Sequence, residues 1–500
     1  MGSIWEDFKE NFKFKKLNKD IEVDICIVGL GITAINTAYF LLKQGYKVAI
    51  IESKEYANNT SSKSTAKLTS QQQLKYTDMI KKYGVEYAKK YFNKQQQAIK
   101  YYKYIIKKEK IDCDFEEKNA YLIAENYEEK EKLISEFKSY KKLNANVKFH
   151  KRKNIPIKHE ALLELKNQAQ FNPVKYMNGI IKILMKNKCK IYINSKVTSI
   201  NKNLNYYNIY SNNNKIKCKY IILATNYPIV KFKGAYFTKL YKSTSYAISF
   251  KIKKDLINGI YINLKDPVYS YRTAKDSNGN LSMIIAGFSH KTGKNIYLNN
   301  NYDELIQKAK SLYPNVIIER KWSTQDATSV DKIPYIGKVC VFNNKILVST
   351  GYSKWGILNS MIAAKIIERK FLKEPKKEDK IFKSTRYKVL KNSKEYIKIF
   401  KDAINYIILE KISLRNFCIK KLKKGEGKVF KRKGQIVGVY KDENDKIHGI
   451  IPLCTHLKCL LKFNELEKTW DCPCHGSKYT YDGKIIYGPG IENLKRIKIK

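Results

Sequence analysis

Two short motifs near the C-terminus combine thiol and imidazole side chains. The first is Cys454-x-His456 and the second is Cys472-x-x-His475, with fifteen residues between them. Two thiolates and two imidazoles form a ligand set that suits an iron–sulfur cluster or a zinc ion. The ligand types alone therefore predict a metal site and leave both metals open.

The residues around these ligands narrow the choice. The stretches CTHLKC and CPCHGS closely resemble the two motif boxes of Rieske [2Fe–2S] domains. In that family two cysteines bind one iron and two histidines bind the other, and the histidines raise the reduction potential. The ligands that the resemblance implies are Cys454, His456, Cys472 and His475.

The same resemblance assigns roles to further residues. It implies a disulfide between Cys459 and Cys474 that ties the two cluster loops together, although disulfides are unusual in the cytosol. It also implies that the Ser477 and Tyr479 hydroxyls bond cluster sulfur, which raises the potential. Lys458 stands where the family usually has glycine, so the backbone of that turn must accept a side chain.

A second motif lies near the N-terminus, where Gly29-x-Gly31-x-x-Ala34 follows a short apolar run and precedes a helical pattern. The glycines allow a tight turn and a close approach to a pyrophosphate, and the small third residue lets the helix pack against the strand. Glu52, after a second apolar run, is placed to accept a hydrogen bond from a ribose hydroxyl. The pattern predicts a dinucleotide site and leaves NAD or FAD open.

Later segments favour FAD by resemblance. The stretches at 60–71 (TSSKSTAKLTSQ), 224–226 (ATN) and 351–360 (GYSKWGILNS) are similar to the D-amino-acid-oxidase-like family of FAD-dependent oxidoreductases. In that family the first stretch lies along the pyrophosphate and the flavin ring, and the last approaches the isoalloxazine. The FAD-binding positions implied are Gly29, Gly31, Ala34, Glu52, Thr65, Lys67, Val197, Thr225, Gly351, Trp355 and Gly356.

Substrate chemistry is less marked in the sequence. Arg272 is an arginine in a lysine-rich chain and could clamp a carboxylate through two parallel hydrogen bonds, although an ion-pair role is equally compatible. His290 follows a strand-like run and is a candidate base or anion binder, with a structural role as the alternative.

Composition bounds the partners. The formal net charge is +52, from 98 basic and 46 acidic residues. Such a charge is typical of proteins that bind nucleic acid or anionic membranes. The basic residues are mostly scattered lysines and join no nucleic-acid motif, so we expect no nucleic-acid partner.

The sequence also bears on location. We find no apolar run of the ~18 residues that a membrane span needs and no secretory signal, and we expect a cytoplasmic protein. The segment 396–412 is amphipathic. Packing against the protein's own body is its favoured use, and membrane association stays an alternative.

These motifs require an α/β Rossmann-like FAD-binding domain with an interleaved α+β substrate domain, followed by a small all-β Rieske domain. The expected division is a flavin region at 1–370, a linker at 371–411 and a Rieske domain at 412–500. Within the first, the FAD-binding segments are expected at about 20–85, 190–230 and 320–370, with the substrate domain between them.

The combination predicts an FAD-dependent oxidoreductase that oxidises a small amine or amino acid and passes electrons through a [2Fe–2S] cluster to an acceptor, either a protein or a quinone. One alternative is an electron-transfer protein that exchanges electrons with a partner without C–N oxidation. Another is a zinc-stabilised nucleic-acid binder. A Rieske-type dioxygenase is disfavoured, because the remaining histidines form no motif of two histidines and a carboxylate.

Overall fold

The first of the sheets carries the N-terminal glycine motif. The computed structural model describes residues 2–229, 234–294, 301–387 and 390–499. Parallel strands form the centre of this sheet in the order β17-β10-β1-β2-β7, and β16, β9 and β8 extend it in antiparallel fashion. The strands are β1 (Ile21–Val28), β2 (Val48–Ile51), β7 (Lys190–Tyr192), β8 (Val197–Lys202), β9 (Tyr207–Ser211), β10 (Asn214–Leu223), β16 (Tyr335–Cys340) and β17 (Asn343–Thr350).

Three helices pack together against this sheet: α1 (Ile32–Lys43), α5 (Pro173–Lys186) and α7 (Gly356–Phe371). In α1 every residue from Ile32 to Leu41 is buried, which is the pattern of a helix enclosed between a sheet and other helices. The α1 helix begins directly after β1, so its N-terminus points to the carboxyl edge of the parallel strands, where dinucleotides bind in such folds.

The second sheet is built from two blocks of chain that interrupt the first sheet. Its order is β15-β11-β14-β13-β12-β4-β6-β3, with β5 beside β6, and only the β12–β4 pair is parallel. The strands are β3 (Lys67–Leu68), β4 (Glu116–Ala124), β5 (Val147–His150), β6 (Ala161–Gln170), β11 (Leu240–Lys251), β12 (Ile260–Asn263), β13 (Tyr269–Lys275), β14 (Leu281–Lys291) and β15 (Ile318–Ser329). The accompanying helices are α2 (Lys75–Tyr83), α3 (Val85–Lys108), α4 (Tyr127–Lys142) and α6 (Asn301–Leu312).

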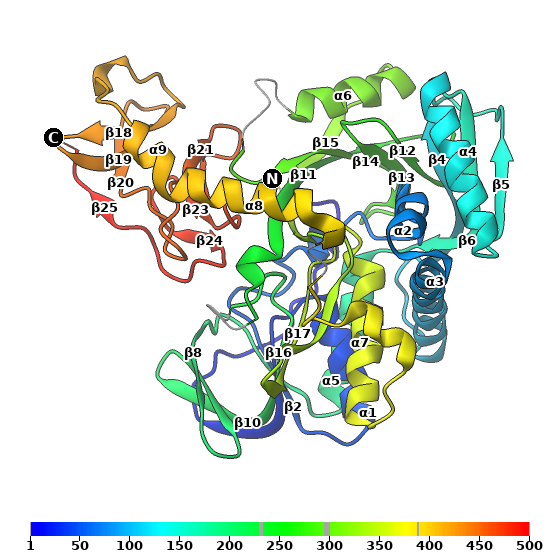
Figure 1. Cartoon of the computed structure of the whole chain (residues 1–500), viewed down its shortest axis with the longest axis horizontal. Helices are drawn as coiled ribbons and strands as arrows, with labels where there is room; N and C mark the ends of the chain where they lie inside the picture. The colour runs from blue at the N-terminus through cyan, green and yellow to red at the C-terminus, as the bar shows by residue number, and fades with distance from the viewer. Residues whose placement is uncertain (1, 230–233, 295–300, 388–389, 500) are drawn as a thin grey trace.

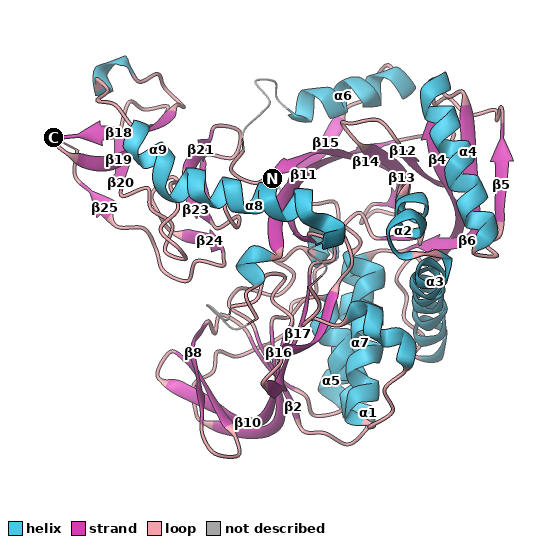
Figure 2. Cartoon of the chain, in the orientation of Figure 1, coloured by secondary structure: helices cyan, strands magenta, loops and turns pink. Residues whose placement is uncertain are grey.

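The C-terminal part consists of two small antiparallel sheets, as Figure 2 shows. One contains β18 (Gly427–Arg432), β19 (Gln435–Lys441), β20 (Ile447–Ile450) and β25 (Arg496–Ile497). The other contains β21 (Lys462–Asn464), β22 (Thr469–Asp471), β23 (Lys478–Thr480) and β24 (Ile485–Tyr487). Aromatic rings fill the core between them. The Phe463 ring meets Trp470 edge to face, with 4.8 Å between ring centroids, and stacks on Tyr440, with 5.0 Å between centroids. The predicted fold class is confirmed in all three parts.

A long helical segment connects the two regions and crosses the front of the molecule in Figure 1. It consists of α8 (Ser393–Ile404), a π-helical turn (Asn405–Leu409) and α9 (Glu410–Ser413). Among the described residues, no helix combines the length and the apolar composition that a bilayer crossing needs.

A buried ion pair holds the loop before β16 against the segment after α7. Arg386 donates from Nε and Nη2 to the two carboxylate oxygens of Asp331, each at 2.8 Å, and both side chains are less than a tenth exposed. The same guanidinium also donates to the Pro334 carbonyl at 2.7 Å. The pair therefore anchors the connecting segment to the flavin region.

Replacing Arg386 by Leu is expected to lower the free energy of unfolding by about 3–5 kcal/mol, because it leaves a buried carboxylate without its bidentate partner. Denaturant unfolding followed by circular dichroism measures the change. The control is Arg320→Leu, which breaks a half-exposed pair with Asp7 and should cost less than about 1 kcal/mol. Equal losses in the two variants would contradict this prediction.

Candidate functional site

The glycine motif forms a tight turn between β1 and α1. Gly29 has φ +103°, and a Cβ there would lie 2.7 Å from the Ala224 carbonyl oxygen, so only glycine fits. The Ile32 backbone N–H donates to Ser61 Oγ at 3.0 Å. Glu52 accepts from the Leu30 N–H at 2.8 Å, so its carboxylate lies directly beside the turn. This end of the site therefore combines the glycine turn and the neighbouring acid of a dinucleotide-binding motif.

A cavity of about 930 Å³ extends from this turn across to the second sheet. Its walls contain all but one of the residues expected to bind FAD: Gly29, Gly31, Glu52, Thr65, Lys67, Val197, Thr225, Gly351, Trp355 and Gly356. Ala34 is the exception, because it is fully buried one turn into α1, where its small side chain serves helix packing. These segments, far apart in sequence, thus meet around one cavity.

Lys67 lies deep in this cavity. Its Nζ donates to Ser270 Oγ at 2.8 Å and to Thr65 Oγ1 at 3.0 Å. Desolvation by the walls, and then the nearby Arg272 guanidinium, lower the pKa of Lys67 to about 7. An anionic group bound beside this amine would favour its charged form.

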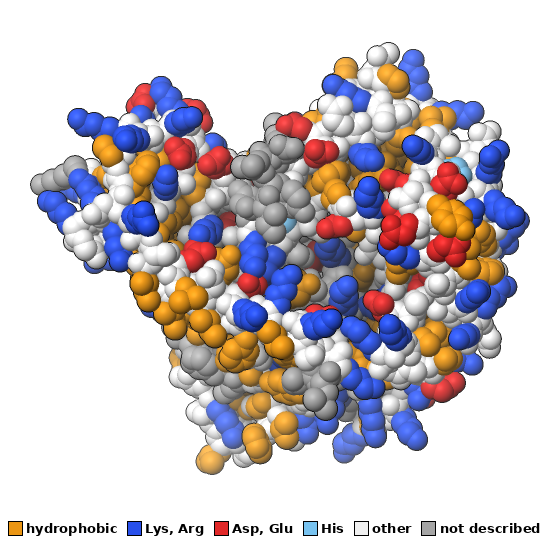
Figure 3. All heavy atoms as spheres, turned by 45° about the horizontal axis from the view of Figure 1, so that its top comes forward, with side chains coloured by type: hydrophobic (Ala, Val, Ile, Leu, Met, Phe, Trp, Pro, Cys, Tyr) orange, Lys and Arg blue, Asp and Glu red, His pale blue; other side chains and the backbone are white. Residues whose placement is uncertain are grey.

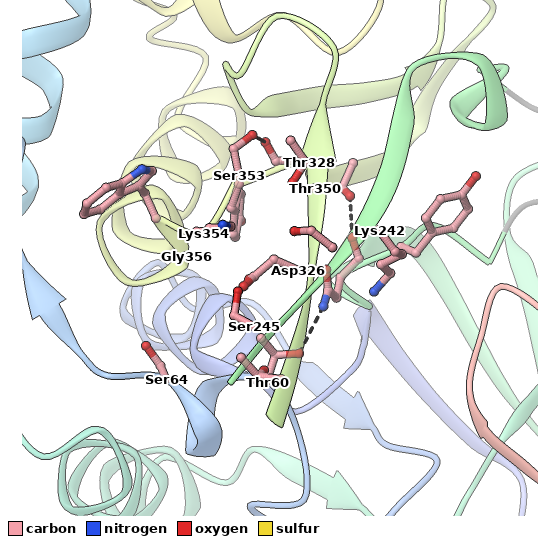
Figure 4. A pocket seen from close by; sticks show the side chains of 18 of the residues that line it. Thr60, Ser64, Lys242, Ser245, Asp326, Thr328, Thr350, Ser353, Lys354 and Gly356 are labelled. Atoms are coloured by element: carbon pink, nitrogen blue, oxygen red, sulfur yellow. Dashed lines mark hydrogen bonds between the residues drawn. The ribbon is translucent and has the colours of Figure 1, made fainter. Parts of the chain in front are cut away.

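The opposite wall has charged residues that the sequence reasoning missed. Lys242 on β11 and Asp326 on β15 line the cavity together with Ser245 and Lys354, as Figure 4 shows. Burial lowers the pKa of Lys242 to about 8 against the opposing effect of Asp326. The sequence offered one signal for Asp326, which is an acid within a strand of small polar residues. It offered no signal for Lys242, because the chain contains many lysines.

His290 also lines the cavity and is almost fully buried. Its Nδ1–H donates to the Lys291 carbonyl at 3.0 Å, so Nε2 accepts from the Tyr246 hydroxyl at 3.0 Å. Burial lowers the pKa of His290 and so favours the neutral ring. The structure therefore places this candidate where it can face a substrate.

Arg272 lies outside the cavity wall. Its Nη1 donates to the carbonyl oxygens of Thr65, Ala66 and Phe171 at 2.8–3.1 Å, and the side chain is only 2% exposed. Because its donors are directed at the backbone, the role predicted for it as a substrate clamp has no support in the geometry. The arginine instead holds the segment that carries Thr65 and Lys67 against the second sheet.

The four expected metal ligands converge at the tips of two loops in the C-terminal part. Cys454, Cys472 and His475 are buried, and the His456 ring centroid lies 5.1 Å from that of His475. A hydrogen bond from the Cys472 thiol, and weaker ones from Ser477 and Tyr479, lower the pKa of Cys454. Cys454 therefore favours the thiolate form that binds metal. Burial, and then the neighbouring Cys454, raise the pKa of Cys472.

The protonation of His475 is set by the flavin region. Its Nε2–H donates to the carbonyl oxygen of Phe237 at 3.0 Å, which leaves the lone pair on Nδ1. That Nδ1 is buried and has no hydrogen-bond partner among the described atoms. An acceptor nitrogen held in this way is what a metal ligand requires, so the donor set fits the implied cluster.

The predicted disulfide is confirmed. Cys459 and Cys474 form a disulfide between the two cluster loops. Their sulfurs also lie within 4.8 Å of Cys472 Sγ, but the bond removes them as thiolate ligands. Tyr479 Oη is 3.6 Å from Cys454 Sγ, and Ser477 Oγ accepts from the Gly490 N–H at 2.8 Å. The bonds from these two hydroxyls to cluster sulfur stay a prediction.

The cluster site and the cavity share a wall. Tyr227 lines the cavity, and its ring centroid lies 6.2 and 6.1 Å from those of His456 and His475. Gly490, whose N–H donates to Ser477 Oγ in the second cluster loop, lines the same cavity. One buried aromatic ring therefore separates the metal ligands from the space in which FAD is expected.

Lys458 adopts the left-handed conformation, with φ +56°. A residue with a side chain is destabilised by about 1–2 kcal/mol in this conformation. Replacing it by glycine removes that strain, but the greater conformational freedom of glycine in the unfolded chain offsets part of the gain in stability. Lys458→Gly is therefore expected to stabilise the C-terminal domain by about 0.5–1 kcal/mol. Denaturant unfolding followed through Trp470 fluorescence tests this prediction. Lys462→Gly, within a strand, should destabilise, and a loss of stability in both variants would contradict the assignment of strain.

Comparisons with known proteins agree with this geometry. The sequence model of the FAD dependent oxidoreductase family (DAO) matches residues 24–369, and that of the Rieske [2Fe-2S] domain matches residues 417–498. The Rieske 2Fe-2S iron-sulfur protein YhfW of Bacillus subtilis is 32% identical over 497 residues, which are 99% of this chain and 97% of the relative. The cytochrome b6-f complex iron-sulfur subunit of Chlorobaculum tepidum is 44% identical over 71 residues, 12% of this chain and 39% of that subunit.

Solved structures show the fold of the larger part. Glycine oxidase from Geobacillus kaustophilus matches with a TM-score of 0.61 at 14% identity, covering 73% of this chain and 99% of the oxidase. L-proline dehydrogenase from P. horikoshii matches with a TM-score of 0.61 at 16% identity, covering 73% and 98%. This chain therefore belongs to the FAD-dependent oxidoreductases of the DAO family and carries a C-terminal Rieske [2Fe–2S] domain.

Proposed function

We propose that this oxidoreductase oxidises a small amine or amino acid in the cavity and delivers the electrons singly to a separate acceptor. FAD supplies hydride acceptance from the carbon next to the amine nitrogen, and the Rieske cluster supplies one-electron transfer. The observation that carries the proposal is the wall shared by the cavity and the cluster ligands. It consists of Tyr227 and the loop at Gly490.

The proposal assigns each group to the residues around it. FAD binding is assigned to Ala34 and to the cavity-lining residues named above. The flavin region is proposed to end at residue 370 and the Rieske domain to begin at residue 412. The cluster is assigned to Cys454, His456, Cys472 and His475. Ser477 and Tyr479 are assigned to tuning, because a hydroxyl near cluster sulfur stabilises the reduced form.

The charges in the cavity favour a substrate that carries a carboxylate. Lys67, Lys242 and Lys354 all line it. The charge of the acid Asp326 interacts with those of Lys242 and Lys354. The structures of similar fold are named glycine oxidase, L-proline dehydrogenase and L-amino acid deaminase. Those names support an amino acid, and His290 with Tyr246 offers the neutral polar wall on which an amine could be oriented.

The acceptor is proposed to approach from the side of His456, which is less buried than His475. The Nε2 of His475 is engaged by the Phe237 carbonyl and is closed to a partner. A protein or a quinone are the two acceptor classes that suit a one-electron centre.

The test is anaerobic mixing of the purified chain with a panel of amino acids and amines. We expect one class to bleach the flavin first and to reduce the cluster afterwards, followed by visible and EPR spectra. In Cys472→Ser the cluster signal should disappear while substrate still bleaches the flavin, because only the ligand is removed. Cys418→Ser, an exposed thiol, is the control. A panel in which no amine bleaches the flavin would favour an electron-transfer protein without C–N oxidation.

Tyr227 provides a second test of the relay. Tyr227→Leu removes the ring between the two sites, so the cluster should be reduced more slowly while substrate bleaches the flavin at an unchanged rate. Tyr227→Phe keeps the ring and should behave as the native protein, because the hydroxyl has no partner among the described atoms. Rapid-mixing spectroscopy separates the two rates. Equal cluster reduction in all three proteins would exclude a path through this residue.

A further inference from the structure

The connecting helix exposes a continuous apolar ridge. Its side chains are half or more exposed, or nearly so, and recur at helical spacing: Ile397 53%, Phe400 61%, Ile404 48%, Ile408 50%, Leu409 54% and Ile412 69%. The opposite face of the same helix is the one that packs inward, through Ile399 and Tyr406. The helix thus has one set of apolar residues that packs against the protein and a second set of apolar residues that faces solvent.

The charges on this helix are sorted in the same way. Its acids pair with lysines outside the helix. Asp402 pairs with Lys291 and Lys294, and Glu410 pairs with Lys462. The exposed Glu395 pairs with Lys82 at 3.7 Å. The exposed lysines, by contrast, take part in none of the ion pairs found among the described residues, and helical spacing places them along one edge of the ridge. They are Lys394, Lys398 and Lys401.

We infer that this ridge seats the protein on an anionic lipid surface. The ridge spans about 22 Å from Ile397 to Ile412 at the rise of a helix, and an apolar stripe edged by lysines is the form of helices that lie in a membrane interface. A second copy of the chain is a poor occupant, because each copy has a net charge of +52. The same charge favours anionic lipid over neutral lipid or a basic partner.

Apolar and basic side chains lie next to one another on the visible face of the space-filling view in Figure 3. Figure 3 shows hydrophobic side chains gathered in a diagonal band on the lower left of the visible face, with Lys and Arg side chains beside it. The connecting helix is held at both ends, because α8 contacts the flavin region and the π-helical turn contacts the Rieske domain. There the Leu460 N–H donates to the Tyr406 carbonyl at 2.9 Å. The inference does not depend on the proposed redox reaction.

The experiment is sedimentation of the full chain with vesicles of phosphatidylcholine alone and of phosphatidylcholine with phosphatidylglycerol. We expect binding to the anionic vesicles that weakens with salt. The variant Phe400→Ser/Ile404→Ser/Ile408→Ser should lower the partition coefficient at least about 100-fold. The matched control, Ile317→Ser/Val341→Ser/Phe342→Ser, alters three residues that are exposed elsewhere and should bind as the native chain does.

A second variant tests the charge. Lys394→Gln/Lys398→Gln/Lys401→Gln should reduce binding to anionic vesicles about 10- to 100-fold and flatten its dependence on salt. Unchanged flavin and cluster spectra in every variant show that the fold is kept. The inference is overturned if the native chain stays in the supernatant with anionic vesicles, or if the ridge and control variants bind alike. It is also overturned if the ridge variant changes the oligomeric state in the absence of lipid, since the ridge would then seat a second copy.

Discussion

The docking of the second cluster loop onto the flavin region sets the arrangement of the two redox sites. A Cβ on Gly476 would lie 2.3 Å from Lys242 Cβ, and a Cβ on Gly293 would lie 2.5 Å from the backbone nitrogen of Pro473. Both glycines have positive φ, which glycine adopts readily. Because they lack a side chain, Gly476 packs directly on the Lys242 stem and Gly293 packs directly on the backbone of Pro473. The hydrogen bond from His475 to Phe237 completes this contact. A cluster bound here is held at the wall of the cavity by packing as close as that of a protein interior.

The same contact explains the unusual position of Lys242. Its stem supports the cluster loop while its amine lies in the cavity, where burial lowers its pKa and Asp326 opposes that shift. A buried amine gains stabilisation whenever negative charge accumulates nearby. Lys242 therefore contacts both the cavity and the loop that carries His475.

The arginines and lysines discussed above have different structural roles. Arg272 and Arg386 are buried and fork between several oxygens, one holding backbone carbonyls and the other a carboxylate. A planar guanidinium satisfies several acceptors at once, which a point-like ammonium does not. The lysines discussed above lie in the cavity or on the connecting helix. There a single positive charge on a flexible side chain is enough to attract an anionic group.

The sequence by itself determined the local chemistry. The Gly29 turn, the Glu52 acid and the spacing of Cys454 to His475 were readable because each motif depends on neighbours a few residues away. The tertiary structure decided which distant residues meet them. Tyr227 and Phe237 reach the cluster ligands across more than two hundred residues of chain, and Arg272 faces the backbone rather than the cavity because β13 directs it there. Such contacts depend on how sheets pack, and packing leaves no periodic trace in the sequence around a single tyrosine, lysine or arginine.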